Sequence, residues 1–339
     1  MAVIKMEMFK AVCLFLIGLV CLIKGGDWFV DGSVGVARRF RVPELLIGAT
    51  IVSIGTTLPE VMVSVTSAIE GYPEMSYGNA IGSVICNTAL IAAVTLAVRP
   101  GTVHRPSLRL PVIFFFAAAL LYCAVSYFSG DFSRPVGIAL LLLFLVYLAL
   151  SVRSAKRSPA ATPAVAPEGD GQTEPAADKP AEGKLWRELL FLIVGAALIA
   201  LGARLLVDNG VVIATVLGVP STVIALTFIA LGTSLPELIT AITSLIKGHS
   251  ALSLGNIIGA NLFNLVLVSG MSMTVRPFHI PETTQIGGLN ASLAVDLPLM
   301  MVVMLILTIP ALVSGRLRRW QGILLLILYA GFCAFQFTV

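Results

Sequence analysis

Ten long apolar runs constrain this chain more than any other feature of its sequence. Each holds about 20 mostly apolar residues, the length that crosses the roughly 30 Å hydrocarbon core of a bilayer as a helix. With 58% hydrophobic and 12% charged residues and a mean hydropathy of +0.98, the chain is too apolar to keep a wetted surface. We therefore expect an all-α integral membrane protein with ten transmembrane helices, at about residues 8–32, 44–69, 76–98, 110–129, 135–152, 187–210, 220–246, 252–275, 289–310 and 320–338.

The chain also contains an internal repeat without gaps. A shift of 177 residues gives 28 identities over positions 25–100, and it places Glu60 on Glu237. Residues 1–153 and 185–339 are therefore predicted to be two homologous units of five helices. Because five is an odd number, the second unit enters the membrane from the opposite side, so the repeat has inverted topology.

A segment of different composition joins the two units. Residues 154–184 are rich in Pro, Ala, Gly and charged side chains and contain no aromatic residue. Such a segment buries too little apolar surface to offset its ordering entropy. We expect a flexible linker.

Basic residues gather in alternate loops, which indicates an orientation. Most Lys and Arg residues lie in the loops at 36–43, 99–109, 152–187, 247–250 and 314–319, whereas the opposite side holds only Lys5, Lys10, Arg134 and Arg276. By the positive-inside rule, the first set of loops and the linker face the cytoplasm and both termini lie outside. The expected location is the plasma membrane, with several passes. The net charge of +4 follows from this asymmetry and gives no support for nucleic-acid binding.

Two apolar runs carry a proline followed by a glutamate. The motif GTTLPE ends at Glu60 and recurs as GTSLPE, which ends at Glu237. Because proline lacks an N–H, Pro59 and Pro236 are predicted to break their helices at the glycine that opens each motif and to free backbone carbonyls. A charge at the bilayer centre costs at least about 2.5 to 3.5 kcal/mol, and these helices hold no Lys or Arg near the glutamates to pair with it. The motifs therefore indicate a buried cation site.

Other oxygen-bearing side chains share helical faces with the two glutamates. The positions on these faces are Ser53, Thr56, Thr57 and Glu60, repeated as Ala230, Thr233, Ser234 and Glu237, then Asn79, Ser83 and Asn87, repeated as Asn256, Ala260 and Asn264. Every candidate ligand is a hard oxygen, which suits Ca²⁺ or Na⁺. The cysteines and histidines show no spacing typical of a soft-metal site, and no bound cofactor is expected.

Charged residues near the ends of two spans have helical pair spacing. We interpret Lys24 with Asp27 and Asp31, and Arg204 with Asp208, as interfacial or gating ion pairs.

The segments GTTLPE…GNAIGSVICN and GTSLPE…GNIIGANLFN resemble the paired alpha repeats of the sodium/calcium exchanger family, within the calcium:cation antiporters, in a prokaryotic-type form. The resemblance covers nearly the whole chain except the linker. It implies ten helices, with broken helices at central ion sites, and a first and a sixth span that slide across the rest.

The resemblance also implies ligands. Calcium would be held by Glu60, Glu237, Thr56 and Thr233. Sodium sites would use the carbonyls of Ser53 and Ala230, then Thr57, Ser83 and Ser234, and again both glutamates and both threonines. Asn87 and Asn264 would line the central position. Val84 and Ala260 depart from the family pattern, and Ala260 lacks a hydroxyl that helps form one sodium site in the family.

Several functions remain open at this stage. The first is a secondary antiporter that exchanges Ca²⁺ for Na⁺ across the bilayer. Its nearest rival is the same machine driven by protons, because a glutamate pair also loads protons. A cation channel would require similar oxygen ligands. Inverted repeats with broken helices, however, are typical of transporters that work by alternating access. An intramembrane enzyme is the weakest option, so we do not expect an enzyme.

Overall fold

The computed structural model describes residues 2–157, 185–216, 232–282, 285–286 and 288–338, which are almost entirely helical. Eight helical stretches in this part are long and apolar enough to cross a membrane, and they match eight predicted spans. The last predicted span matches α15 (Arg319–Thr338). The span at 220–246 is described only from residue 232 onward and contains α11 (Leu235–Ile246). The ten-helix architecture is confirmed.

The two units contain corresponding elements, with π-helical segments marked η. The first unit consists of α1 (Ala2–Phe40), α2 (Glu44–Ile47), η1 (Gly48–Val52), α3 (Ser53–Glu70), α4 (Pro73–Cys86), η2 (Asn87–Ala92), α5 (Ala93–Val98), α6 (Arg105–Phe128) and α7 (Arg134–Arg157). The second consists of α8 (Leu185–Val216), α11, α12 (Ser250–Phe263), η4 (Asn264–Val268), α13 (Ser269–Val275), η5 (Ser292–Asp296), α14 (Leu297–Ser314) and α15. Helix α7 continues past the predicted start of the linker at residue 154, and linker residues 158–184 lie outside the described part.

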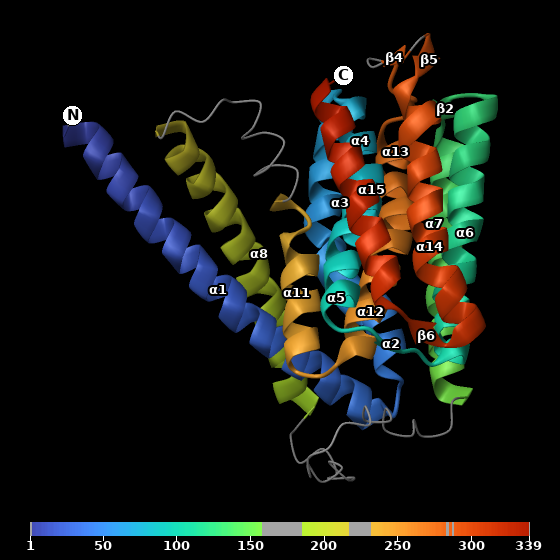
Figure 1. Cartoon of the computed structure of the whole chain (residues 1–339), viewed down its shortest axis with the longest axis horizontal. Coiled ribbons are helices and arrows are strands. Elements are labelled where there is room, and N and C mark those ends of the chain that lie inside the picture. Colours follow the sequence, from blue (N-terminus) through green and yellow to red (C-terminus); the bar gives the residue numbers. More distant parts are fainter. Residues whose placement is uncertain (1, 158–184, 217–231, 283–284, 287, 339) are drawn as a thin grey trace.

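Helices α1 and α8 lie together, tilted, on one side of a bundle formed by the other helices (Figure 1). The start of α1 and the end of α15 lie at the same end of the molecule, which we call the terminal face. The end of α7 and the start of α8 lie at the other end, which we call the linker face. The two termini therefore share one face, as an even number of spans requires.

In the described part of the chain, three short antiparallel ladders lie outside the helices. Strand β1 (Gly101–Thr102) pairs with β6 (Arg316–Leu317), and β2 (Asp131–Phe132) pairs with β3 (Phe278–His279). Strand β4 (Gln285–Ile286) pairs with β5 (Leu289–Asn290). The first two ladders join a strand of one repeat to a strand of the other, so they tie the two repeats together.

The main apolar core lies among α4, α6, α12 and α14, and α12 is buried along nearly its whole length. A smaller core lies along α1 and α8 and includes Leu22, Phe29 and Ile199. The α1–α8 pair therefore packs mainly on itself, and the same core also contains Ile47, Val52 and Leu252 of the bundle.

Glycines bring α1 and α8 into close contact. A Cβ atom on Gly25 would lie 2.8 Å from the backbone nitrogen of Ile199 and 2.9 Å from the backbone oxygen of Gly195. A Cβ atom on Gly18 would lie 2.9 Å from the backbone oxygen of Gly202. These contacts are related by the 177-residue repeat, so a pseudo-twofold axis passes through the crossing.

The helix interruptions take different forms in the two units. In the second unit, residues 233 and 234 form a turn directly before α11, as the motif predicts. In the first unit, α3 stays helical through Gly55 and Pro59, and the irregular segment is the π-helix η1, which ends just before α3. The predicted break at Gly55 is therefore wrong in position. Proline removes one hydrogen bond there, yet the α-helix continues through it.

Candidate ion-binding site

The two motif glutamates lie in the interior. Glu60 on α3 and Glu237 on α11 are both 0% exposed. The Thr57 hydroxyl, one turn from Glu60, donates to Oε1 of Glu237 over 3.5 Å. Neither glutamate points toward lipid, and each side chain comes from a different repeat.

Hydrogen bonds to these carboxylates are few. Both Glu60 side-chain oxygens and Oε2 of Glu237 have no hydrogen-bond partner among the described residues, and neither glutamate forms an ion pair there. A structural salt bridge therefore does not explain them within this part of the chain. Buried carboxylates without partners are costly unless a cation or a proton neutralises them.

Two equivalent hydrogen bonds join the repeats around the glutamates. Thr56 donates to Oδ1 of Asn256 at 3.1 Å, and Thr233 donates to Oδ1 of Asn79 at 3.2 Å. The 177-residue shift converts one pair into the other. These bonds join α3 to α12, and they join the turn directly before α11 to α4, so the repeated motifs of both units lie together around the glutamates.

Hydroxyl groups complete the inner surface. The Ser234 hydroxyl lies 3.5 Å from the Ser83 hydroxyl, which brings another sequence-predicted pair together. The Ser53 hydroxyl donates to the backbone oxygens of Gly48 and Asn256, at 2.7 and 2.9 Å, so it serves helix packing. Ala230, the equivalent of Ser53, lies outside the described residues.

Two buried asparagines begin equivalent π-helices. Asn87 starts η2, Asn264 starts η4, and both are 0% exposed. Neither amide has a hydrogen-bond partner for its oxygen or nitrogen among the described residues. A π-helical turn shifts the i to i+4 bonding pattern, and such turns often occur at functional sites. Both asparagines are therefore available as oxygen ligands.

Two of the candidate oxygen ligands, Asn79 and Asn256, form hydrogen bonds that position the helices of the site. Asn79 donates from Nδ2 to the backbone oxygen of Glu60 at 3.1 Å and to the Ser64 hydroxyl at 2.8 Å, so it positions the helix that carries Glu60. Asn256 accepts from both Ser53 and Thr56. The Gly-Asn dipeptide at the same place in both repeats was the available signal.

The charged pairs near the span ends differ in part from the prediction. Lys247, at the end of α11, contacts Asp31 at 2.7 Å and Asp27 at 3.4 Å, so these aspartates pair with Lys247 across helices. The prediction that Lys24 pairs with them is wrong, because α11 packs on this side of α1. The Arg204–Asp208 pair is confirmed, at 3.5 Å.

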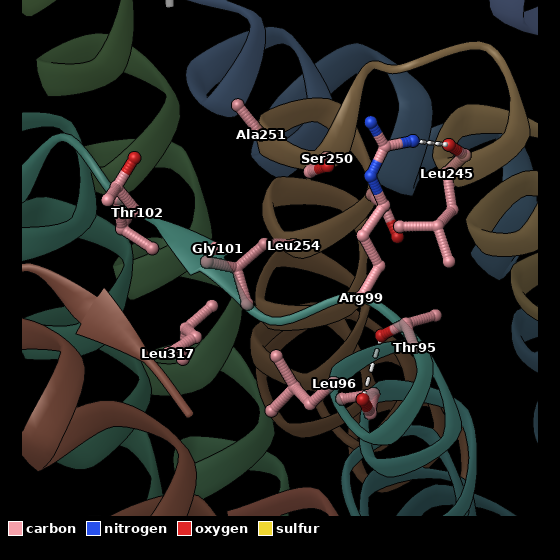
Figure 2. Close-up of a pocket in the computed structure, with 13 residues that line it drawn as sticks. Thr95, Leu96, Arg99, Gly101, Thr102, Leu245, Ser250, Ala251, Leu254 and Leu317 are labelled. Atoms are coloured by element: carbon pink, nitrogen blue, oxygen red, sulfur yellow. Dashed lines mark hydrogen bonds between the residues drawn. The ribbon is translucent and has the colours of Figure 1, made fainter. Parts of the chain in front are cut away.

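Two pockets lie near these elements. The smaller is lined by Phe29, Ala196 and Ile199 from the α1–α8 pair and by Thr56, Pro59 and Pro236 beside the glutamates. The larger lies between α5, α12 and the β1–β6 ladder, and Arg99 at its rim donates to the backbone oxygen of Leu245 (Figure 2). The larger pocket contains none of the predicted site residues, so only the smaller one borders the site.

A sequence model for the family described as "Sodium/calcium exchanger protein" matches residues 10–153 and 187–338. The chain belongs to the sodium/calcium exchanger family. The matched residues span both five-helix units and leave out the linker between them.

Individual members of the exchanger family agree with this. The chain is 36% identical over 274 residues to the inner membrane protein YrbG of Escherichia coli, covering 80% of this chain and 82% of that protein. It is 28% identical to the sodium/calcium exchanger MaX1 of Methanosarcina acetivorans, over 96% of this chain and 98% of that one. The solved sodium-calcium exchanger NCX_Mj, soaked with Na⁺ and Sr²⁺, superposes with a TM-score of 0.77 at 30% identity, covering 96% of this chain and 99% of that one.

Membership of the exchanger family makes this protein a multi-pass membrane protein and a cation antiporter, and it supports calcium and sodium as the transported ions.

Proposed function

We propose that this protein exchanges Ca²⁺ for Na⁺ across the plasma membrane by alternating access. The supporting observation is the pair Glu60 and Glu237: two fully buried carboxylates from opposite repeats, with no basic partner among the described residues. Hydroxyl and amide oxygens surround them, and hard oxygen ligands favour these two cations over soft-ligand metals.

In this proposal the residues divide between two kinds of site. Calcium is held by the carboxylates of Glu60 and Glu237 together with Thr56 and Thr233. Sodium is held by the Ser53 and Ala230 carbonyls, by Thr57, Ser83 and Ser234, and by the same glutamates and threonines. Asn87 and Asn264 line the centre. No bound cofactor or enzymatic step is part of the cycle.

The same charges favour exchange over leak. Two ionised carboxylates that face each other in a low-dielectric interior repel strongly, so the empty site is unfavourable. One Ca²⁺ neutralises the pair, and so do two Na⁺. The protein therefore reorients only when cations occupy the site, which couples the two fluxes.

The α1–α8 pair is the part that we expect to move. Its two helices make close glycine contacts with each other, and a small pocket lies between the pair and the site. A rigid pair that slides past the site opens it first to one side of the membrane and then to the other.

Flux in reconstituted vesicles tests the driving ion. Purified protein in liposomes should take up radioactive calcium when an outward sodium gradient is imposed, and an imposed pH gradient without sodium should not replace it. Uptake that follows the pH gradient and ignores sodium would assign proton coupling. Large uncoupled cation currents in the same vesicles would identify a channel.

A further inference from the structure

Lys247 fastens α1 to the rest of the protein at the linker face. Its ammonium donates to Asp31 Oδ1 at 2.7 Å and to the backbone oxygen of Asp27 at 3.0 Å, and it lies 3.4 Å from Asp27 Oδ1. The Lys247 side chain is 24% exposed. One cation therefore lies between two carboxylates, and it joins the end of α11 to α1.

The inverted repeat places an equivalent cluster toward the other face, with its charges exchanged. By the 177-residue shift the equivalent positions are Glu70 for Lys247, Arg204 for Asp27 and Asp208 for Asp31. The cation of this second cluster sits on α8, and an acid sits at the end of α3. Each cluster still contains one cation and two carboxylates. The helices α1 and α11 in one cluster, and α8 and α3 in the other, therefore carry opposite charges that attract each other.

The second cluster is open in this structure. Arg204 is 83% exposed and pairs with Asp208 on its own helix at 3.5 Å. Glu70 is exposed and forms no ion pair within the described residues. The two equivalent ends of the α1–α8 pair are therefore held differently.

Apolar packing shows the same asymmetry. On the linker side a Cβ atom on Gly26 of α1 would lie 2.8 Å from Cγ2 of Ile239 and 2.8 Å from the Thr243 hydroxyl, so α1 is in contact with α11. The equivalents of these α11 residues are Met62 and Thr66 on α3, which are exposed, Met62 by 66%. Helix α8 has thus not covered this part of α3.

We propose that Glu70 and Arg204 form an ion pair that closes the terminal face in the opposite-facing state, while Lys247 releases Asp27 and Asp31. This inference rests on the alternating access in the proposed function. The two charge-reversed clusters act as alternate latches, one closed in each state. Solvent-exposed ion pairs are weak, which suits contacts that must break in every transport cycle.

Chemical labelling at position 62 tests the latch without any transport measurement. In detergent-purified full chain carrying Met62→Cys, an impermeant maleimide should label Cys at this position readily, because the terminal face is open. Peptide mass spectrometry reads that position separately from the native cysteines. Adding Lys247→Glu should reduce the labelling rate about two- to five-fold, since it repels both aspartates and favours the other state.

Two further changes give the sharper readout. Adding Arg204→Glu to the Lys247→Glu protein should restore labelling, because Glu70 then faces a like charge. Adding Glu70→Arg to that protein should lower labelling again. Arg153→Glu on α7 carries the same charge reversal and should change nothing. If Lys247→Glu fails to fold, Lys247→Gln replaces it.

The proposed pair is overturned if Arg204→Glu does not restore labelling, if Glu70→Arg does not reduce it again, or if the change at Lys247 leaves labelling unaltered. Because the assay needs no ion flux, an absence of calcium transport would contradict the proposed function and leave this test intact.

Discussion

At the scale of single residues, the two glutamates dominate the site because they are buried carboxylates that form no ion pair among the described residues. We expect Glu60→Gln or Glu237→Gln to abolish calcium transport and to weaken calcium binding more than about 100-fold, since removing one buried charge partner typically costs about 3 to 5 kcal/mol. The amide keeps the shape of the side chain, so the thermal midpoint should not fall.

Radioactive calcium uptake and a thermal melt in parallel measure these two effects. Glu282→Gln makes the same chemical change outside the helical spans and serves as the control. Transport that persists in either glutamate variant would contradict a two-carboxylate site.

Ala260 is a site position at which the two repeats differ. The equivalent Ser83 lies 3.5 Å from Ser234, whereas Ala260 is fully buried and has no hydroxyl to offer Thr57, the residue equivalent to Ser234. Ala260→Ser should therefore lower the sodium concentration for half-maximal exchange by about two- to tenfold, the range that one added ligand or hydrogen bond provides. Ala118→Ser, in the apolar core, is the matched control, and an unchanged sodium dependence would show that this hydroxyl has no role.

His279 on the terminal face gives a pH-dependent contribution to stability. Its Nδ1 lies 2.8 Å from Oδ1 of Asp131, and the bond to this carboxylate raises the pKa of His279 above its usual 6.5, with a smaller contribution from Glu282. The stabilisation is therefore fully present below about pH 6.5 and is lost as pH rises through the raised pKa.

Because this pair is largely exposed, the effect on the thermal midpoint should be about 1 °C. Asp131→Asn should flatten the change of thermal midpoint between pH 6 and pH 8.5. An unchanged pH slope in that variant would contradict this assignment.

At the scale of helices and turns, the sequence predicted element types better than their local geometry. Ten apolar runs and the equal spacing of two motifs fixed the helices and their pairing, because hydropathy and repeat symmetry act over many residues. The π-helical turns at Asn87 and Asn264 were not predicted, since one extra residue in a turn leaves no trace in composition. The partner of Asp27 and Asp31 was also missed, because helical spacing cannot report which other helix packs alongside.

The glycine crossing of α1 and α8 predicts a specific sensitivity. Gly25→Ala forces a methyl group against the backbone of Gly195 and Ile199, so we expect a loss of about 1 to 3 kcal/mol, as for overpacked cores. Gly331→Ala on α15 meets nothing within 4 Å and should be neutral or stabilising, because alanine favours the helix. Thermal melts compare the two variants. Equal thermal midpoints would mean that α1 and α8 can move apart at the crossing without loss of stability.

At the scale of the whole molecule, the inverted repeat explains why so much of the site could be predicted from the sequence. Once two homologous units of five helices are inferred, a pseudo-twofold axis must bring the equivalent motifs together, and Thr56–Asn256 and Thr233–Asn79 are that symmetry in atomic detail. The symmetry of the repeat does not predict whether the terminal face or the linker face is closed in a given structure. That depends on small energy differences between nearly equivalent contacts, such as those of Lys247 and Glu70.

The remaining global property is orientation, which the alternate loops predict. Both termini lie at one face in the structure (Figure 1), and the basic loops predict that this face is outside the cell. Each basic side chain moved outward against the membrane potential costs about 2.3 kcal/mol per 100 mV, so many charges on one side favour this orientation.

In intact cells, an external protease should remove a tag at the C-terminus. A tag inserted at residue 170 of the linker should stay protected until the membrane is permeabilised. The opposite pattern would reverse the topology, and the face that Lys247 closes in this structure would then be the outer one rather than the cytoplasmic one.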